Sequence, residues 1–292
     1  MFNIVAKRSI FFIISGLVII AGIIAMVAFG GLNTDIDFTG GTAMYVNLGA
    51  EYDEAGIRDA LKGVEGVSVS SVQKTGDQEA VIKTAELATE QRVAVEEALK
   101  AKFASASIMS VDNVSATVGQ ELWGNAAKSI LIAVVLMLIY ITFRFELLSG
   151  ISAVIALAHD LLVMMAIYAI FRFPVNTSFI AAMLTILGYS INATIVIFDR
   201  IRENTRFLKK ETFRDIVNKS IWQSMGRSIN TSLTTLLTIV MVYILGVPSI
   251  RDFALPLIIG IVAGTYSSIF IAGQFWVLFK GKDKKDIAKA KA

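Results

Sequence analysis

The chain has 292 residues, of which 55% are hydrophobic and only 17% are charged, whereas soluble domains carry about 25% charged residues. It contains no cysteine and one histidine, which excludes a disulfide framework, a cysteine-ligated zinc site, a cysteine nucleophile and a metal centre built from several histidines of this chain. The net charge is +3, and the basic residues gather in short segments, as membrane topology signals do. We therefore expect a membrane protein, and we expect no metal or cofactor.

Six stretches have the length and apolar character of membrane-spanning helices, which need about 20 apolar residues. They are 10–30, 125–143, 148–171, 177–198, 228–247 and 253–279. The first follows Lys7 and Arg8, but its apolar run is longer than the roughly 7–15 residues of a signal peptide. We interpret it as an uncleaved anchor.

The polar segment 35–122, between the first two spans, has the pattern of a small α+β domain. Strands are predicted at 41–48, 67–74, 80–84 and 107–114, and helices at 53–62 and 90–103. The order βαββαβ is that of a ferredoxin-like domain. The sequence thus divides into an N-terminus with the first span (1–34), this domain (35–122), a five-helix bundle (123–279) and a basic tail (280–292).

Lysine and arginine predict the orientation, because they accumulate in short cytoplasmic loops. The loop 199–226 and the tail from Lys280 onward are both basic, whereas the loops on the opposite side hold only Arg172 and Arg251. Six spans with both termini in the cytoplasm satisfy this pattern. We expect a multi-pass protein of the bacterial plasma membrane whose ferredoxin-like domain lies outside the cytoplasm.

Asp160 lies in the middle of the third span, ~18 Å along the helix from Leu148. A buried Asp there costs about 2.5–3.5 kcal/mol on insertion scales. It is either a packing carboxylate satisfied by a neighbouring helix or part of an ion path. His159 precedes it, but adjacent helical side chains point ~100° apart, so we expect that the two cannot form a pair of catalytic base and orienting carboxylate. With no G-x-S-x-G, H-E-x-x-H or phosphate-loop motif, an intramembrane hydrolase is a poor interpretation.

The fourth and fifth spans each carry a polar stripe. In the fourth, Thr185, Gly188, Tyr189 and Asn192 share one helical face, which Asp199 extends toward the cytoplasm. The stripe of the fifth span consists of Arg227, Asn230, Thr231, Thr234, Thr235 and Thr238. Because lipid acyl chains offer no hydrogen-bond partners to such polar faces, we expect the two stripes to contact each other or a partner protein.

Two further features of these spans allow a structural interpretation. Arg227 either reaches to the lipid head groups or points into the polar seam. In the sixth span, Gly260, Gly264, Ser268 and Ala272 recur every four residues. Such a small-residue stripe favours close helix packing over chemistry.

Several motifs, in order along almost the whole chain, resemble those of the SecD/SecF family. They are Asp37-Phe38-Thr39-Gly40-Gly41, Val118-Gly119 with Glu121-Leu122, Phe143-Arg144-Phe145-Glu146, Ala156-Leu157-Ala158-His159-Asp160, Gly188-Tyr189-Ser190-Ile191-Asn192, Asp199-Arg200-Ile201-Arg202-Glu203-Asn204, and Gly226-Arg227-Ser228 with Thr231-Ser232.

The resemblance implies a six-helix fold of the RND superfamily and a transport function without enzymatic catalysis. It implies a SecD partner beside the SecY/SecE/SecG channel, with SecA and YajC in the same assembly and an unfolded polypeptide as the substrate. Family members use the proton or sodium motive force. The implied cation-pathway residues are His159, Asp160, Tyr189, Asn192, Thr194, Asp199 and Arg227, and the residues of the first motif are Asp37, Phe38, Gly40 and Gly41.

One position departs from the family pattern. The family commonly has Asn-Asp-Thr in the fourth span, whereas this chain has Asn192-Ala193-Thr194, and alanine cannot titrate. Three interpretations are open. In the first, another carboxylate such as Asp160 carries the cation. In the second, the carrier lies entirely on SecD, and in the third, the chain is an altered or uncoupled version. Two other functions remain open: a non-energised scaffold of the Sec complex, and a stand-alone RND-type exporter.

Overall fold

The computed structural model describes residues 3–208 and 210–280, so all of the predicted tail except Lys280 lies outside the described residues. Within them, six helices are long and apolar enough to cross a membrane. Five are single α-helices: α1 (Arg8–Ala28), α5 (Ala116–Arg144), α6 (Leu147–Phe171), α7 (Thr177–Phe207) and α8 (Phe213–Leu245). The sixth consists of α9 (Pro248–Ser267), the π-helix η1 (Ser268–Ala272) and α10 (Gly273–Lys280). The predicted number of spans is confirmed.

The predicted loop 199–226 is wrong, because α7 continues to Phe207 and α8 begins at Phe213. At 1.5 Å per residue the 31 residues of α7 extend over roughly 46 Å, which exceeds the ~30 Å hydrocarbon core. The polar C-terminal turns of α7 therefore continue as helix beyond its apolar run. Of the basic residues described in this region, Arg200, Arg202 and Arg206 lie on α7 and Arg214 and Lys219 lie on α8, whereas Lys210 lies in the turn between the two helices.

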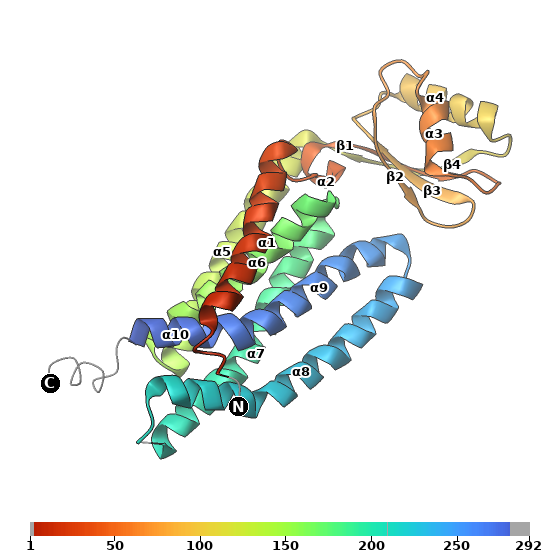
Figure 1. Cartoon of the computed structure of the whole chain (residues 1–292). Coiled ribbons are helices and arrows are strands. Elements are labelled where there is room, and N and C mark those ends of the chain that lie inside the picture. The colour runs from red at the N-terminus through yellow and green to blue at the C-terminus, as the bar shows by residue number, and fades with distance from the viewer. Residues whose placement is uncertain (1–2, 209, 281–292) are drawn as a thin grey trace.

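The sheet domain follows the predicted order of strands and helices. It contains β1 (Gly41–Asn47), α3 (Glu54–Leu61), β2 (Val69–Lys74), β3 (Glu79–Thr84), α4 (Thr89–Lys102) and β4 (Ser107–Val114). The four strands lie in the order β2-β3-β1-β4 with antiparallel pairing throughout. Alternation along β1 places Met44 and Val46 in a core with residues of α3 and α4, such as Ile57 and Leu99. Figure 1 shows this domain beyond one end of the helical bundle.

A short helix, α2 (Ile36–Thr39), joins α1 to the sheet and packs against the first turns of α5. Gly40 has φ +76°, and a Cβ there would lie 2.7 Å from the backbone nitrogen of Ala116. A Cβ on Gly119 of α5 would lie 2.5 Å from the carbonyl oxygen of Phe38. Both positions therefore require glycine. β1 and β4 pair directly, so the two connections to the bundle leave from neighbouring strands.

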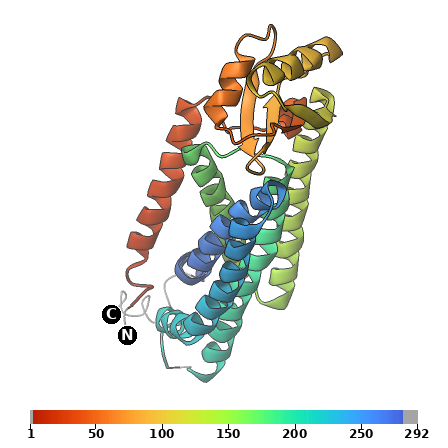
Figure 2. The same ribbon diagram turned by 90° about the vertical axis from the view of Figure 1, so that its right-hand side faces the viewer.

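The bundle has a buried centre and an exposed periphery. α6, α7 and α9 pack against one another and contain most of the buried helix positions, whereas α1, α5 and α8 are largely exposed. Figure 2 shows α1 along one edge of the bundle. The described end of the chain at α10, the turn between α5 and α6, the last turns of α7 and the first turns of α8 lie at the end opposite the sheet domain (Figure 1).

Candidate functional site in the helical bundle

Asp160 is the centre of a buried polar network that joins four helices. Its carboxylate has no exposed surface. Oδ2 accepts hydrogen bonds from the hydroxyl of Ser190 on α7 at 2.5 Å and from that of Ser267, at the end of α9, at 2.9 Å. Oδ1 lies 3.0 Å from Nδ1 of His159, and Nε2 of His159 lies 2.8 Å from Oγ of Ser15 on α1. Because each oxygen has a partner, the burial of this group is compensated.

The contact between His159 and Asp160 contradicts the sequence prediction. Their Cα–Cβ bonds diverge along the helix, but the imidazole turns so that Nδ1 reaches the neighbouring carboxylate. Together with Ser15 the pair has the hydrogen-bond order of a Ser-His-Asp triad. Ser15, however, lies inside α1, where backbone N–H groups are engaged in the helix and cannot form an oxyanion hole. The arrangement is suited to moving a proton and not to acyl transfer.

The network continues along α7 into the π-helical segment. Oγ1 of Thr194 lies 3.0 Å from Oγ of Ser268, the first residue of η1. Ser268 also donates to the carbonyl of Gly264 at 2.7 Å. π-Helical turns occur often at functional sites, and this one begins directly after Ser267, which donates a hydrogen bond to Asp160. Of the predicted site residues, His159 contacts Asp160 directly, whereas Thr194 contacts Ser268, the neighbour of the donor Ser267.

The small-residue stripe allows α9 to approach α7 closely. A Cβ on Gly260 would lie 2.4 Å from Cγ1 of Ile186, and one on Gly264 would lie 2.9 Å from Cβ of Ser190. The packing interpretation of this stripe is confirmed. The close approach also places Ser267 within reach of Asp160.

Asn192 and Arg227 do not join this network. Both are exposed, as are Thr185 and Gly188 of α7 and much of the α8 stripe. The hydroxyls of Thr185 and Thr238 donate to carbonyls of their own helices, and Arg227 forms no ion pair within the described residues. Tyr189 has a buried hydroxyl without a partner in the described part of the chain. The polar stripes thus form outward faces on the isolated chain.

Asp199 likewise lies apart from Asp160. It forms an ion pair with Arg144 of α5 at 3.2 Å, and both side chains are about half exposed. This ion pair joins the last residue of α5 to α7 at a position eight residues before α7 ends. Within the described residues, no group of three His, Asp or Glu side chains is arranged to hold a metal ion.

Comparison with known proteins places this architecture. Residues 94–282 match the profile of the family described as "Protein export membrane protein SecD/SecF, C-terminal". The chain is also 39% identical to the protein translocase subunit SecF of Alicyclobacillus acidocaldarius, over 97% of this chain and 94% of that protein. The chain belongs to the SecD/SecF family. With six apolar helices, it is a multi-pass protein of the bacterial plasma membrane.

Two SecD/SecF relatives are much longer. The chain is 38% identical to the protein translocase subunit SecDF of Bacillus subtilis, over 97% of this chain but 39% of that protein. The crystal structure of SecDF from Thermus thermophilus, described as a translocon-associated membrane protein, superposes with a TM-score of 0.85 at 33% identity and covers 96% of this chain and 39% of that one. The fold is therefore that of one portion of SecDF.

The first SecD/SecF motif, Asp37–Gly41, lies where the sheet domain joins the helical bundle. Oδ2 of Asp37 accepts hydrogen bonds from the backbone nitrogen of Thr177 at 2.9 Å and from its hydroxyl at 2.7 Å, at the start of α7. Phe38 is buried and packs edge-on against Trp123 of α5, with ring centroids 5.0 Å apart. Gly40 and Gly41 let the chain pass between α2, α5 and β3. The motif fixes the base of the sheet domain on the bundle.

Sequence reasoning missed the three serines of the SecD/SecF network. Ser190 belongs to the motif Gly188-Tyr189-Ser190-Ile191-Asn192. Ser15 and Ser267 are each only a small polar residue in an apolar helix, which gives no signal of a site. Ser267 directly precedes Ser268 of the small-residue stripe. Residue spacing within one helix does not show whether Ser267 points toward Asp160, because the sequence does not say which helices pack against each other.

Proposed function

We propose that the chain is the SecF-type subunit of a protein translocase, acts with a SecD-type chain, and uses cation movement to help export unfolded polypeptides. Its relatives bear the names of translocase subunits. In the proposed orientation both termini lie in the cytoplasm and the segment 35–122 lies outside. The support is the placement of basic helix ends opposite the sheet domain (Figure 1).

The exposed polar faces of α7 and α8 support a partner within the membrane. Arg227, Asn192 and several threonines lie on these faces, and a guanidinium exposed to hydrocarbon is costly. A partner with its own polar or acidic groups would remove that cost. SecDF chains, of which this chain covers 39%, carry additional sequence that a separate SecD-type chain would supply here.

Asp160 is the proposed carrier of the cation, and the observation that supports it most is its fully buried network. With an ionised carboxylate, His159 donates from Nδ1, and Ser190 and Ser267 donate to Oδ2. With a protonated carboxylate, Oδ1–H donates to Nδ1 and Nε2–H donates to Ser15. In both states the four side chains around Asp160, namely Ser15, His159, Ser190 and Ser267, keep a hydrogen-bond partner. A proton can therefore be taken up or released without leaving an unpaired polar group.

The energy available is sufficient to shift a helix rearrangement. One charge crossing 100 mV yields about 2.3 kcal/mol, which changes a two-state ratio about 50-fold. Ser267 precedes η1, so a change in its hydrogen bond with Asp160 acts on a helical segment with irregular hydrogen bonding. Movement of α7 reaches the sheet domain through Asp37, which caps the start of α7.

Ala193 favours a second candidate function, a scaffold that holds the Sec complex together without using a gradient. Position 193 is half-buried in α7, and alanine there cannot bind a cation. In that case the carrier would lie on the SecD-type chain.

The test is export into proteoliposomes that contain the Sec channel, SecA, a SecD-type chain and this chain, at limiting ATP with an imposed gradient. Asp160→Asn should abolish the gradient-dependent increase in export and leave ATP-driven export intact. Asp199→Asn, which neutralises a half-exposed carboxylate on the same bundle, should leave the increase intact.

Unchanged gradient dependence in Asp160→Asn would exclude Asp160 as the carrier. Stimulation of export by this chain that persists undiminished after the gradient is dissipated would favour the scaffold. Ala193→Asp should steepen the dependence on the gradient if the alanine weakens coupling.

A further inference from the structure

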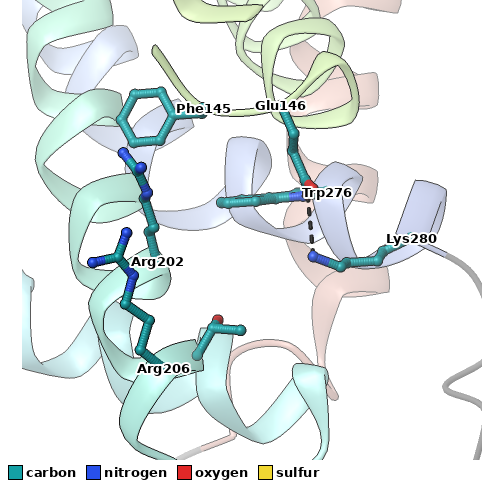
Figure 3. A pocket seen from close by; sticks show the side chains of 7 residues that line it. Phe145, Glu146, Arg202, Arg206, Trp276 and Lys280 are labelled. Carbon is teal, nitrogen blue, oxygen red and sulfur yellow. Dashed lines mark hydrogen bonds and ion pairs between the residues drawn. The ribbon is translucent and has the colours of Figure 1, made fainter. Parts of the chain in front are cut away.

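A basic cavity of about 250 Å³ lies at the end of the bundle opposite the sheet domain. The turn between α5 and α6 forms one wall, the last turns of α7 a second and α10 a third (Figure 3). Its lining residues are Phe145, Glu146, Arg202, Thr205, Arg206, Trp276 and Lys280.

The charges around this cavity are not balanced. Oε1 of Glu146 accepts hydrogen bonds from Nε1 of Trp276 at 2.6 Å and from Nζ of Lys280 at 3.1 Å, so this carboxylate pairs with Lys280 and not with an arginine of the cavity. Arg202 donates to the carbonyl of Arg144 at 3.2 Å. Within the described residues neither Arg202 nor Arg206 has a carboxylate partner. The lining therefore carries three cations and one anion.

Arg202 and Arg206 are one helical turn apart and line the same cavity (Figure 3). Like charges at this spacing repel each other, and no acidic side chain among the described residues compensates them. Two adjacent guanidinium groups with free N–H donors are suited to the oxygens of a phosphate, which they can bind through paired hydrogen bonds. Lys280, across the cavity on α10, adds positive charge on the other side.

We propose that this cavity binds the phosphate of an anionic phospholipid. Free inorganic phosphate shares this chemistry, but the surroundings favour a lipid. Phe143, near the end of the apolar helix α5, is 94% exposed and stands two residues before the lining residue Phe145. Trp276 forms one side of the cavity, and indole rings concentrate at the membrane–water interface. Acyl chains of a bound lipid would continue along the exposed ring of Phe143.

The lipid site depends on membrane embedding and not on the proposed cation coupling. A bound phosphate would bridge α7 and α10, because Arg202 and Arg206 belong to the first and Lys280 to the second. It would therefore hold the segment that follows the π-helix against the end of α7.

The experiment measures lipid binding by the purified full chain in detergent, by native mass spectrometry and by the thermal midpoint. The ligands are phosphatidylglycerol, phosphatidylcholine and inorganic phosphate. Phosphatidylglycerol should bind and raise the midpoint, whereas the other two should not. The double variant Arg202→Gln/Arg206→Gln should bind phosphatidylglycerol at least about tenfold more weakly.

The matched control is Arg200→Gln/Arg214→Gln, which removes the same charge from the same end of the bundle outside the cavity. It should keep wild-type binding. Equal binding of phosphatidylcholine, or an equal loss in the control, would overturn the proposal. An effect of inorganic phosphate as large as that of phosphatidylglycerol would show a soluble-anion site instead. If the double variant is unstable, Arg202→Lys/Arg206→Lys keeps the charge, and undiminished lipid binding by it would contradict the guanidinium-specific site.

Discussion

Nζ of Lys83 on β3 lies 2.5 Å from Oδ2 of Asp35, at the entrance to α2, and only 12% and 4% of the two side chains are exposed. Asp35 also caps α2 through the backbone nitrogen of Ile36, and its own backbone nitrogen donates to Val175 between α6 and α7 at 2.9 Å. This ion pair therefore connects the sheet with the end of the bundle that lies next to it.

Lys83→Ala should lower the stability of the full chain by roughly 3 kcal/mol, because it leaves the carboxylate of Asp35 buried without its cation. Thermal unfolding in detergent measures the change. Lys62→Ala removes a lysine from an exposed pair with Asp59 and should leave the stability almost unchanged, because solvent screens exposed ion pairs. Equal effects of the two substitutions would contradict a structural role for the Lys83–Asp35 pair.

Gly264→Ala should destabilise the bundle by about 1–3 kcal/mol, because the new methyl group meets Ser190 and separates α9 from α7. The same shift should weaken the contacts of Asp160 with Ser190 and Ser267. Gly16→Ala is the control, since no atom lies within 4 Å of the added Cβ. It should be neutral or stabilising by up to about 1 kcal/mol. A comparable loss of thermal stability in both variants would argue against close packing at Gly264.

Asp37→Ala should cost about 1 kcal/mol and loosen the first turn of α7, because Thr177 loses the acceptor for its backbone N–H. Asp37→Asn keeps an oxygen acceptor and should lose less. Hydrogen exchange at the first amides of α7 is the measurement. Asp53→Ala removes the cap of α3 and should leave exchange in α7 unchanged. Faster exchange there in Asp53→Ala would show a general loss of stability and not a local cap.

Stability should fall in alkaline solution partly through Tyr52. Burial raises the pKa of its phenol above the ordinary value, and the charge of Glu54 adds to the effect. Because the pKa is higher in the folded state than in the unfolded state, the contribution is complete below pH ~10 and is lost as the pH rises through the folded-state pKa.

Tyr52→Phe tests this contribution. It removes the hydrogen bond to the carbonyl of Glu79, which should cost about 1 kcal/mol at neutral pH, and it should make the alkaline decline shallower. The thermal midpoint of both proteins between about pH 8 and 11.5 gives the comparison. Parallel curves over this range would contradict the role of Tyr52.

The sequence was sufficient for the number of spanning helices and for the element order of the sheet domain, because both depend on hydrophobic periodicity and turn residues. It was insufficient for the helix ends. α7 continues to Phe207 and α8 begins at Phe213, and these polar turns lack an apolar run that would mark them as helix. Tertiary contacts, such as the hydrogen bond of Asn204 to Ser220 at 2.8 Å, hold them.

The polar network was only partly predictable. Asp160 stood out because a carboxylate in an apolar helix is rare. A serine there gives no such signal, because its hydroxyl can donate to its own helix, as Ser152 does to the carbonyl of Leu148. Which serines turn instead toward Asp160 depends on the packing of α7 and α9. The orientation of His159 depends on side-chain torsions that spacing does not determine.

The π-helical segment Ser268–Ala272 has a consequence for everything that follows it. A π turn accommodates about one residue more than an α turn, so α10 is rotated by roughly 100° relative to an uninterrupted helix. That rotation is what turns Trp276 toward Glu146 while Ser267 still reaches Asp160. Deleting a single residue from this stretch would restore a regular helix but would force the two contacts out of phase, so that only one of them could be kept.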